Sequence, residues 1–222
     1  MNKKILFALL IVFISVGCQR FDPMSGTRDP HISWWDLRFT GPSYMVGVIE
    51  DSAVVDINGE LFRHGSSGAV GYGDPGDEKE SAKGWSGTGA SGRSVTGADF
   101  PRRIFVRWQS IVEPQTYRGW IEIPEEARQI MRTSTARRCP SAPEQRTRVS
   151  AAVTLGLAPG GIIQLWVMDN CHRAVKIADA RVQAEIEPLG PSQGLTEGRY
   201  AYKISDVSKR YIERFGIPYG SW

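Results

Sequence analysis

Histidine is scarce in this chain of 222 residues, which contains only His31, His64 and His172. The motif HExxH and a phosphate-binding loop with its lysine are also absent from the sequence. These absences exclude a zinc-protease helix and a P-loop nucleotide site. A Ser-His-Asp triad is left open because its members meet only in space, but no histidine lies in a recognisable nucleophile or base context. We therefore expect a protein that is not an enzyme.

The sequence likewise offers little evidence of motifs that bind metals or cofactors. No CxxC pair occurs, and the acidic residues Asp74, Asp77, Glu78 and Glu80 lack the spacing of an EF-hand loop. The stretch Gly87–Gly92 has the form GxGxxG, but a loop precedes it and a predicted strand follows it. A dinucleotide site needs a strand before this motif and a helix after it. We expect no metal and no cofactor.

The excess of basic charge is small. The formal net charge is +3, and it falls to +1 when Lys3 and Lys4 are removed with the signal described below. The arginines between Arg128 and Arg148 have no aromatic neighbours for base stacking, so they are interpreted as a solvated helix face. A nucleic-acid partner, which would need a concentrated basic patch, is not expected.

Near its start the sequence has an apolar run from Ile5 to Ile14, preceded by Lys3 and Lys4. Ten residues are too few to span a bilayer, which takes about 20, but they suit a secretory signal. Cys18 directly after a small residue resembles the cleavage site of bacterial lipoproteins, which implies that its thiol is acylated. Ser15 stands where leucine is usual, so an ordinary signal with an incidental cysteine is the alternative.

This interpretation divides the chain into a signal peptide at 1–17, a lipid-anchored tether at 18–31 and a single β-rich domain at 32–222. Gln19 follows the cysteine, where aspartate would retain an enteric lipoprotein at the inner membrane. The resemblance therefore implies the periplasmic face of the outer membrane, with the membrane itself as a partner through the lipid.

Two cysteines are left once Cys18 is assigned to lipid. Cys139 and Cys171 would then stand in an oxidising compartment and enclose residues 140–170. In the chain-entropy model a disulfide between them contributes roughly 3–4 kcal/mol. A redox pair or a metal site is the alternative, with His172 as the only nearby histidine.

Period-two alternation of apolar and polar residues dominates the domain and predicts strands. Asn58-Gly59 between apolar runs predicts a hairpin. Helical spacing after Pro124 and again from Ile204 to Phe215 predicts two short helices, one near the C-terminus. The fold expected is mainly β, either an antiparallel β-sandwich or a strongly bent sheet.

The segment 65–99 is expected to be a long loop, because 10 of its 35 residues are glycine and few are large and apolar. Loops of this length are functional or disordered. Trp85 is the candidate for binding a partner, since buried aromatic side chains dominate interface energetics. The alternative for Trp85 is a core tryptophan folded back under the loop.

Four stretches carry a resemblance to a known family. They begin at Gly97 (GADFPRRIFVRWQS), Glu113 (EPQTYRGWIEIP), Leu155 (LGLAPGGI) and Gly216 (GIPYGSW). Together they resemble a family of Gram-negative lipoproteins known only as a domain of unknown function, often encoded near lipase effectors of type VI secretion. The resemblance implies an immunity protein that binds and neutralises a lipase-type toxin. A structural or accessory lipoprotein of the cell envelope is the alternative.

Cys18 provides the first testable prediction. Cys18→Ala removes the thiol that would carry the lipid, so we expect an unacylated protein with its precursor uncut or cut elsewhere. Membrane fractionation after a carbonate wash measures this, and retention of the variant in the membrane fraction would refute the anchor.

Overall fold

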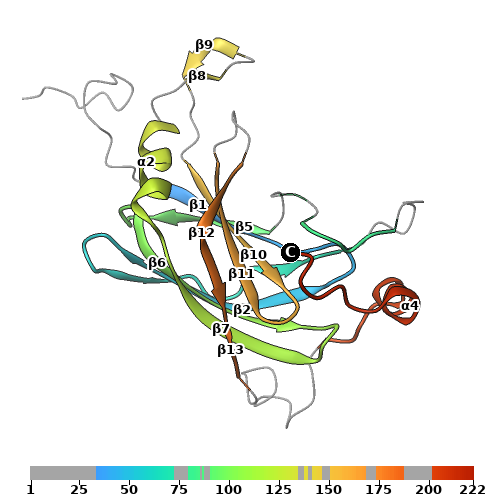
Figure 1. The fold of residues 1–222 in the computed structure, drawn as a ribbon. Coiled ribbons are helices and arrows are strands. Elements are labelled where there is room, and N and C mark those ends of the chain that lie inside the picture. The colour runs from blue at the N-terminus through green and yellow to red at the C-terminus, as the bar shows by residue number, and fades with distance from the viewer. Residues whose placement is uncertain are drawn as a thin grey trace, which may run out of the picture. The chain divides into compact units, whose positions relative to one another are not determined.

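The computed structural model describes residues 34–72, 80–85, 87, 91–134, 138–139, 142–146, 151–168, 174–187 and 202–222. In these residues the chain forms two large β-sheets, a two-stranded sheet and two helices (Figure 1). The predicted mainly β class, with one helix near the C-terminus, is confirmed. The expected signal peptide and tether lie outside the described residues.

One large sheet, sheet A, has the strand order β12-β11-β10-β1-β5. Its strands are β1 (Trp34–Thr40), β5 (Gly92–Thr96), β10 (Ala152–Ala158), β11 (Ile162–Met168) and β12 (Val175–Gln183). β1 and β10 run parallel, with Asp36 opposite Ala152, whereas the other pairs of the sheet are antiparallel. Sheet A of the predicted sandwich is therefore mixed, with this one parallel pair among antiparallel ones. Alternation of apolar side chains is the same for both strand directions, so it does not reveal which one occurs.

The other large sheet, sheet B, has the order β13-β7-β6-β2-β3, and β4 also pairs with β2. Its strands are β2 (Gly47–Asp56), β3 (Leu61–Arg63), β4 (Gly68–Val70), β6 (Pro101–Ser110), β7 (Gln115–Glu122) and β13 (Glu185–Ile186). The predicted hairpin joins β2 to β3. Its turn is closed by the Asp56 carboxylate, which accepts hydrogen bonds from the amides of Asn58 (2.9 Å) and Glu60 (3.0 Å). Gly59 supplies the positive φ of +87° that this turn requires.

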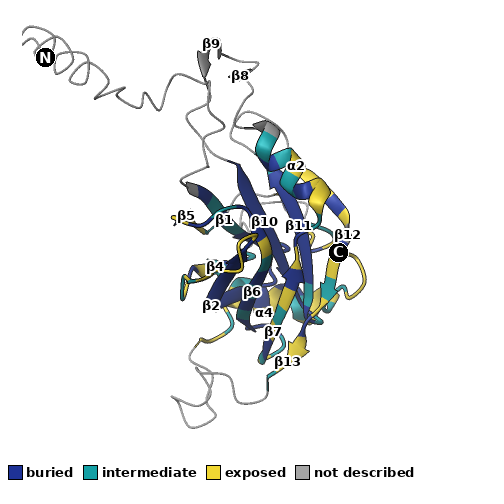
Figure 2. Cartoon of the chain, turned by 90° about the vertical axis from the view of Figure 1, so that its left-hand side faces the viewer, coloured by how far each residue is buried: buried dark blue, intermediate teal, exposed yellow. Residues whose placement is uncertain are grey.

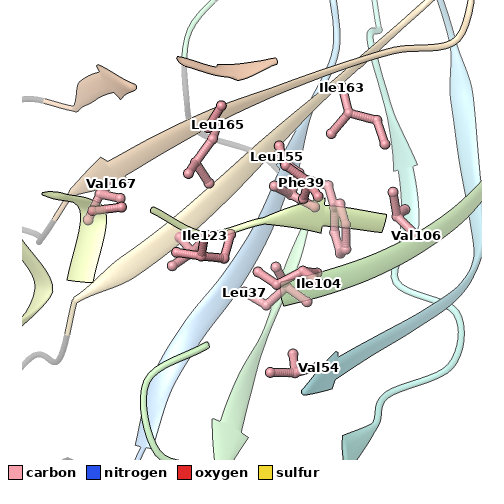
Figure 3. Packing of buried hydrophobic residues seen from close by; sticks show 14 of the residues in the cluster. Leu37, Phe39, Val54, Ile104, Val106, Ile123, Leu155, Ile163, Leu165 and Val167 are labelled. Atoms are coloured by element: carbon pink, nitrogen blue, oxygen red, sulfur yellow. The ribbon is translucent and has the colours of Figure 1, made fainter. Parts of the chain in front are cut away.

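The core lies between the two sheets (Figures 2 and 3). The predicted inward face of β1 is confirmed, because Trp35, Leu37 and Phe39 are at most 1% exposed. Ile104 and Val106 of β6 meet this face from sheet B within the same cluster. A core that both sheets share makes the domain a β-sandwich.

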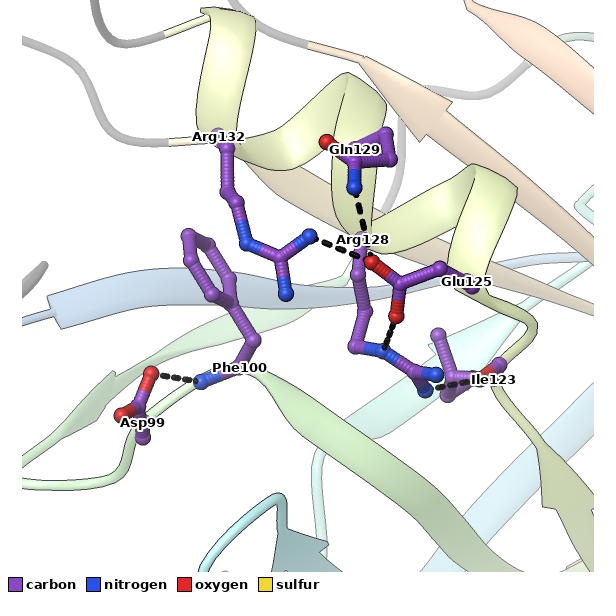
Figure 4. Close-up of polar contacts among 7 residues, drawn as sticks. All are labelled: Asp99, Phe100, Ile123, Glu125, Arg128, Gln129 and Arg132. Carbon is purple, nitrogen blue, oxygen red and sulfur yellow. Dashed lines mark hydrogen bonds and ion pairs between the residues drawn. The ribbon is translucent and has the colours of Figure 1, made fainter.

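Helix α2 (Glu125–Ser134) follows Pro124 and inserts Ala127 and Met131 into that core. The Glu125 carboxylate at its first turn accepts hydrogen bonds from Arg132 (2.6 Å), Arg128 (2.8 Å) and Gln129 (2.9 Å) (Figure 4). Hydrogen bonding, first from Arg132 and then from Arg128, lowers the pKa of Glu125 to about 2. Arg128 and Arg132, two of the arginines considered for nucleic-acid binding, therefore form hydrogen bonds within helix α2.

Helix α4 (Asp206–Phe215) is capped at both ends: the Ser205 hydroxyl accepts a hydrogen bond from the Ser208 amide, and the Gly216 amide donates to the Ile212 carbonyl at the last turn. Its Tyr211 ring stacks on Tyr44 with 4.5 Å between centroids. β8 (Arg138–Cys139) and β9 (Ala142–Arg146) form the two-stranded sheet.

The segment 65–99 is not a loop throughout. β4 pairs with β2, and β5 forms the edge of sheet A beside β1. Both strands are short and rich in glycine and small residues, so they lack the apolar alternation from which strands are predicted. Residues 73–79 of this segment lie outside the described residues.

The chain changes sheets at Ala184. β12 belongs to sheet A and β13 to sheet B, and the Ala184 amide between them donates to the carbonyl of Gly161 (2.7 Å). The sequence predicts one long strand here with Ile186 facing the core, but Ile186 is 58% exposed. Upstream, β12 bulges between the partners of Gln164 and Leu165.

Gln164 fills this bulge. Its side chain is 2% exposed, and its amide nitrogen donates to the Ile177 carbonyl (2.8 Å), with the carbonyls of Leu165 and Ala180 at 3.3 and 3.4 Å. The bulge therefore depends on one buried donor, because carbonyls turned away from the ladder need another partner.

We predict that Gln164→Leu lowers the free energy of unfolding by about 1–3 kcal/mol, because it leaves buried carbonyls without a donor. The control Gln129→Leu removes only a solvent-exposed hydrogen bond to Glu125, so it should change the free energy of unfolding by less than about 0.5 kcal/mol. Urea unfolding measures both.

Gln164→Glu extends this test. Burial raises the pKa of the new carboxyl above its unfolded value of about 4.3. Below about pH 4.3 the carboxyl is protonated and contributes its full stabilisation, which is lost as the pH rises through the folded pKa. A Gln164→Glu variant equally stable at pH 4 and pH 7 would contradict this account.

Candidate binding surface

The structure leaves the predicted cysteine roles untested. Cys18 and Cys171 lie outside the described residues, and Cys139 is described only as backbone in β8. Lipidation of Cys18 and the bridge between Cys139 and Cys171 stay predictions.

Trp85, the predicted contact residue, is half-buried against the outer face of sheet A. Its ring meets Trp166 edge to face, with 5.0 Å between centroids and 78° between planes. Gly156 makes room for it, since a Cβ there would lie 2.5 Å from the Trp85 ring. This packing resembles the core-tryptophan alternative more closely than a protruding anchor.

A different aromatic pair lies on the outer face of sheet B. Phe105 of β6 is directly opposite Trp120 of β7, with ring centroids 5.3 Å apart. Trp120 is 37% exposed, and the Arg103 guanidinium lies 4.4 Å from the centroid of its ring. We call Arg103, Phe105, Arg118 and Trp120 the aromatic–arginine surface.

A groove of about 470 Å³ adjoins this surface at the seam between the sheets. Its lining residues are Phe105, Arg118, Gly119, Trp120, Val182, Gln183 and Glu185. It lies between β7 and the end of β12, where the chain departs from one sheet to join the other. At Gly119 a Cβ would lie 3.3 Å from the Ala184 Cβ, so glycine allows the crossing chain to pack closely on β7.

Charges surround the groove in an incompletely paired arrangement. Glu187 lies 3.9 Å from Arg107 and 3.6 Å from Arg118, and Glu185 lies 3.8 Å from Arg118. These distances allow attraction but exceed those of direct hydrogen bonds. Among the described residues no carboxylate lies within ion-pair distance of Arg103. The surface therefore offers guanidinium groups beside the exposed ring of Trp120 and the half-buried ring of Phe105.

The sequence contains the alternation that places Phe105 and Trp120 on the face opposite the core, and the structure confirms that face. The sequence alone does not identify Phe105 and Trp120 as a binding site. Two large aromatic residues on the solvent side of consecutive strands are the signal that could have done so.

A second cluster joins three of the four stretches that carry the family resemblance. One carboxylate oxygen of Glu113 accepts hydrogen bonds from the Gly160 amide (2.8 Å) and from the hydroxyls of Tyr219 (2.8 Å) and Tyr117 (3.2 Å). The Trp222 indole nitrogen donates to the Pro159 carbonyl (3.1 Å). The Glu113 cluster (Glu113, Tyr117, Gly160 and Tyr219) thus ties the C-terminal segment to two turns of the sandwich.

Both tyrosine hydroxyls of the cluster are held in their neutral form. Burial, and then the adjacent Glu113 carboxylate, raises the pKa of Tyr117 above its usual range. The same two causes raise the pKa of Tyr219 to about 12. Neutral hydroxyls that donate to one carboxylate support a structural role for this cluster.

In the described part of the chain no group of three or more His, Cys, Asp or Glu side chains is placed to hold a metal ion. Among the same residues, no helix combines the length and apolar character needed to cross a membrane.

Comparison with known proteins gives one match. A family model described as a protein of unknown function (DUF2931) matches residues 24–220. No curated protein and no solved structure matches the chain.

For the Glu113 cluster we predict that Tyr219→Phe lowers the free energy of unfolding at pH 7 by about 0.5–1 kcal/mol, the usual net value of one hydrogen bond. The control Tyr202→Phe, also an exposed tyrosine, should change it by less than about 0.5 kcal/mol. Because the folded pKa of Tyr219 is raised, its contribution is complete below about pH 10 and is lost as the pH rises toward 12. The variant should therefore lose less stability over that interval than the wild type, and equal losses in urea titrations would contradict the assignment.

Proposed function

Because the chain belongs to the DUF2931 family, we propose its function from its surface and its predicted anchor: it is a binding module that captures another protein. The single observation that carries this proposal is the aromatic–arginine surface, with its adjoining groove, on the outer face of a rigid sheet. Tryptophan, tyrosine and arginine provide most of the binding energy in protein interfaces. An exposed tryptophan between a phenylalanine and an arginine has the composition of such a centre.

We further propose that the protein is an immunity lipoprotein of the outer membrane that neutralises a lipase-type toxin in the periplasm. Three considerations support this. The sequence stretches resemble a lipoprotein family encoded near type VI lipase effectors. A phospholipase attacks membrane lipids, so its inhibitor is most effective when held at the membrane, as acylated Cys18 would do. Blocking an enzyme needs a stable interface of about 800 Å² per partner and no chemistry of its own.

A sandwich core suits this role. The residues beneath the aromatic–arginine surface include Ile104, Val106 and Ile121, which are fully buried. A surface supported by a close-packed core changes little on binding and loses little conformational entropy. The function proposed therefore relies on preorganisation.

The test is to search the genes beside this chain for a lipase-type toxin and to express that toxin in the periplasm, with and without the full-length protein. We expect viability to be restored and the two proteins to co-purify. The Cys18→Ala variant should protect less well while binding the purified toxin with unchanged affinity, because the lipid affects location and not the interface. If the toxin kills cells equally with and without the protein and no complex is purified, the immunity function is refuted and an accessory lipoprotein of the envelope is favoured.

A further inference from the structure

We propose that the partner binds by strand addition: an extended segment pairs with the free edge of β7 at 119–122, rests an apolar side chain on Phe105 and Trp120, and places a carboxylate at Arg118. This inference rests on the proposed function and deepens it by naming the contact element and the chemistry of the partner.

The edge of β7 is only partly covered. β13 pairs only with Tyr117 and Arg118 of β7. It reaches no further toward Trp120 because the residues before Ala184 belong to β12 in sheet A. In the described part of the chain no strand forms ladder hydrogen bonds with residues 119–122 on this side of β7, although the end of β12 lies close to it. Unpaired backbone at a sheet edge is a template for another strand.

The direction of each backbone group on β7 follows from two hydrogen bonds. The Thr116 carbonyl accepts from the Glu187 amide (2.9 Å), whereas the Ile123 amide donates to the Arg102 carbonyl on the opposite side (2.9 Å). The register between β6 and β7 is unbroken from Arg103 to Ser110, so the backbone groups alternate regularly. Trp120 and Glu122 therefore direct their N–H and C=O groups to the free edge.

The groove provides space for the added segment. It borders this edge, with Trp120 and Phe105 on the β7 side and Val182 and Gln183 on the side of β12. Its volume of about 470 Å³ lies within the range of pockets that hold small ligands or a few side chains. In strand addition, backbone hydrogen bonds provide affinity, and pockets for alternate side chains provide specificity. The aromatic pair selects an apolar side chain on the sheet face.

The positive charge of the arginines determines which side chain the partner segment places next to its apolar one. Arg118 is 48% exposed and meets carboxylates only at 3.6 Å or more, and one of these, Glu185, is 79% exposed. A carboxylate from a partner could replace such weak, solvated pairs with direct hydrogen bonds to the guanidinium. Arg103 lies over Trp120, and no carboxylate of the described residues, its register partner Glu122 included, is within ion-pair distance of it, so it favours the same sign. The partner segment is therefore apolar and acidic.

The experiment measures binding of the full-length protein, in detergent, to the lipase-type toxin with its catalytic serine changed to alanine. We expect Trp120→Ala to raise Kd by at least about 30-fold and Arg118→Glu by at least about 10-fold. The controls Leu61→Ala and Arg63→Glu alter an exposed leucine and an arginine of β3, at the opposite edge of the same sheet. Their Kd should stay within about threefold of the wild type.

Amide hydrogen exchange tests the strand itself. In the complex, exchange at Trp120 and Glu122 should slow by at least about tenfold, while Ile121, whose amide faces β6, should change little. If the wild type binds and both groove variants bind equally well, this inference fails and the proposed function stands. Binding that depends on Trp120 without slower exchange at Trp120 and Glu122 would refute strand addition. No binding by the wild type would refute the proposed function itself, and edge protection that grows with concentration of the free protein would assign the edge to a second copy.

Discussion

The crossing of the chain at Ala184 is the constraint on which the functional surface depends. One amide hydrogen bond to Gly161 fixes the point at which β12 ends in sheet A and β13 begins in sheet B. Had the residues before Ala184 paired with β7 instead of with sheet A, they would have covered the edge beside Trp120. The bulge filled by Gln164 and the absence of a side chain at Gly119 both allow the crossing to occur where it does. Core geometry and surface geometry are therefore set by the same few backbone contacts.

Much of the fold follows from local sequence patterns. Alternation predicts the inward faces of β1, β6 and β7, and the Asn58-Gly59 pair predicts the first hairpin, because strand period and turn conformation are local properties. The parallel pairing of β1 with β10 has no local signal. The short strands β4 and β5 were missed for a different reason: their stability comes from the neighbours to which they hydrogen-bond, and not from their own side chains.

The candidate surface was harder to predict than the fold. Trp85 was selected for its place in a glycine-rich segment, but Gly156 and Trp166, far away in the sequence, provide a place for its ring. Alternation along the strands places Trp120 and Phe105 on the outer face of a sheet, yet nothing local distinguishes an outer face that stays open from one covered by another segment. The Glu113 cluster shows the same limit, because its members come from turns and a terminal segment that meet only in the folded chain.

The parallel pair of β1 and β10 has a consequence for the rate of folding. Well over a hundred residues separate Asp36 from its partner Ala152, so loop closure over that length precedes any gain from the pairing. Until β10 arrives, β1 has Trp35, Leu37 and Phe39 on one face with only part of their final surroundings. Slow, non-local closure leaves the apolar face of β1 incompletely covered until late in folding, and such transiently exposed surface favours aggregation.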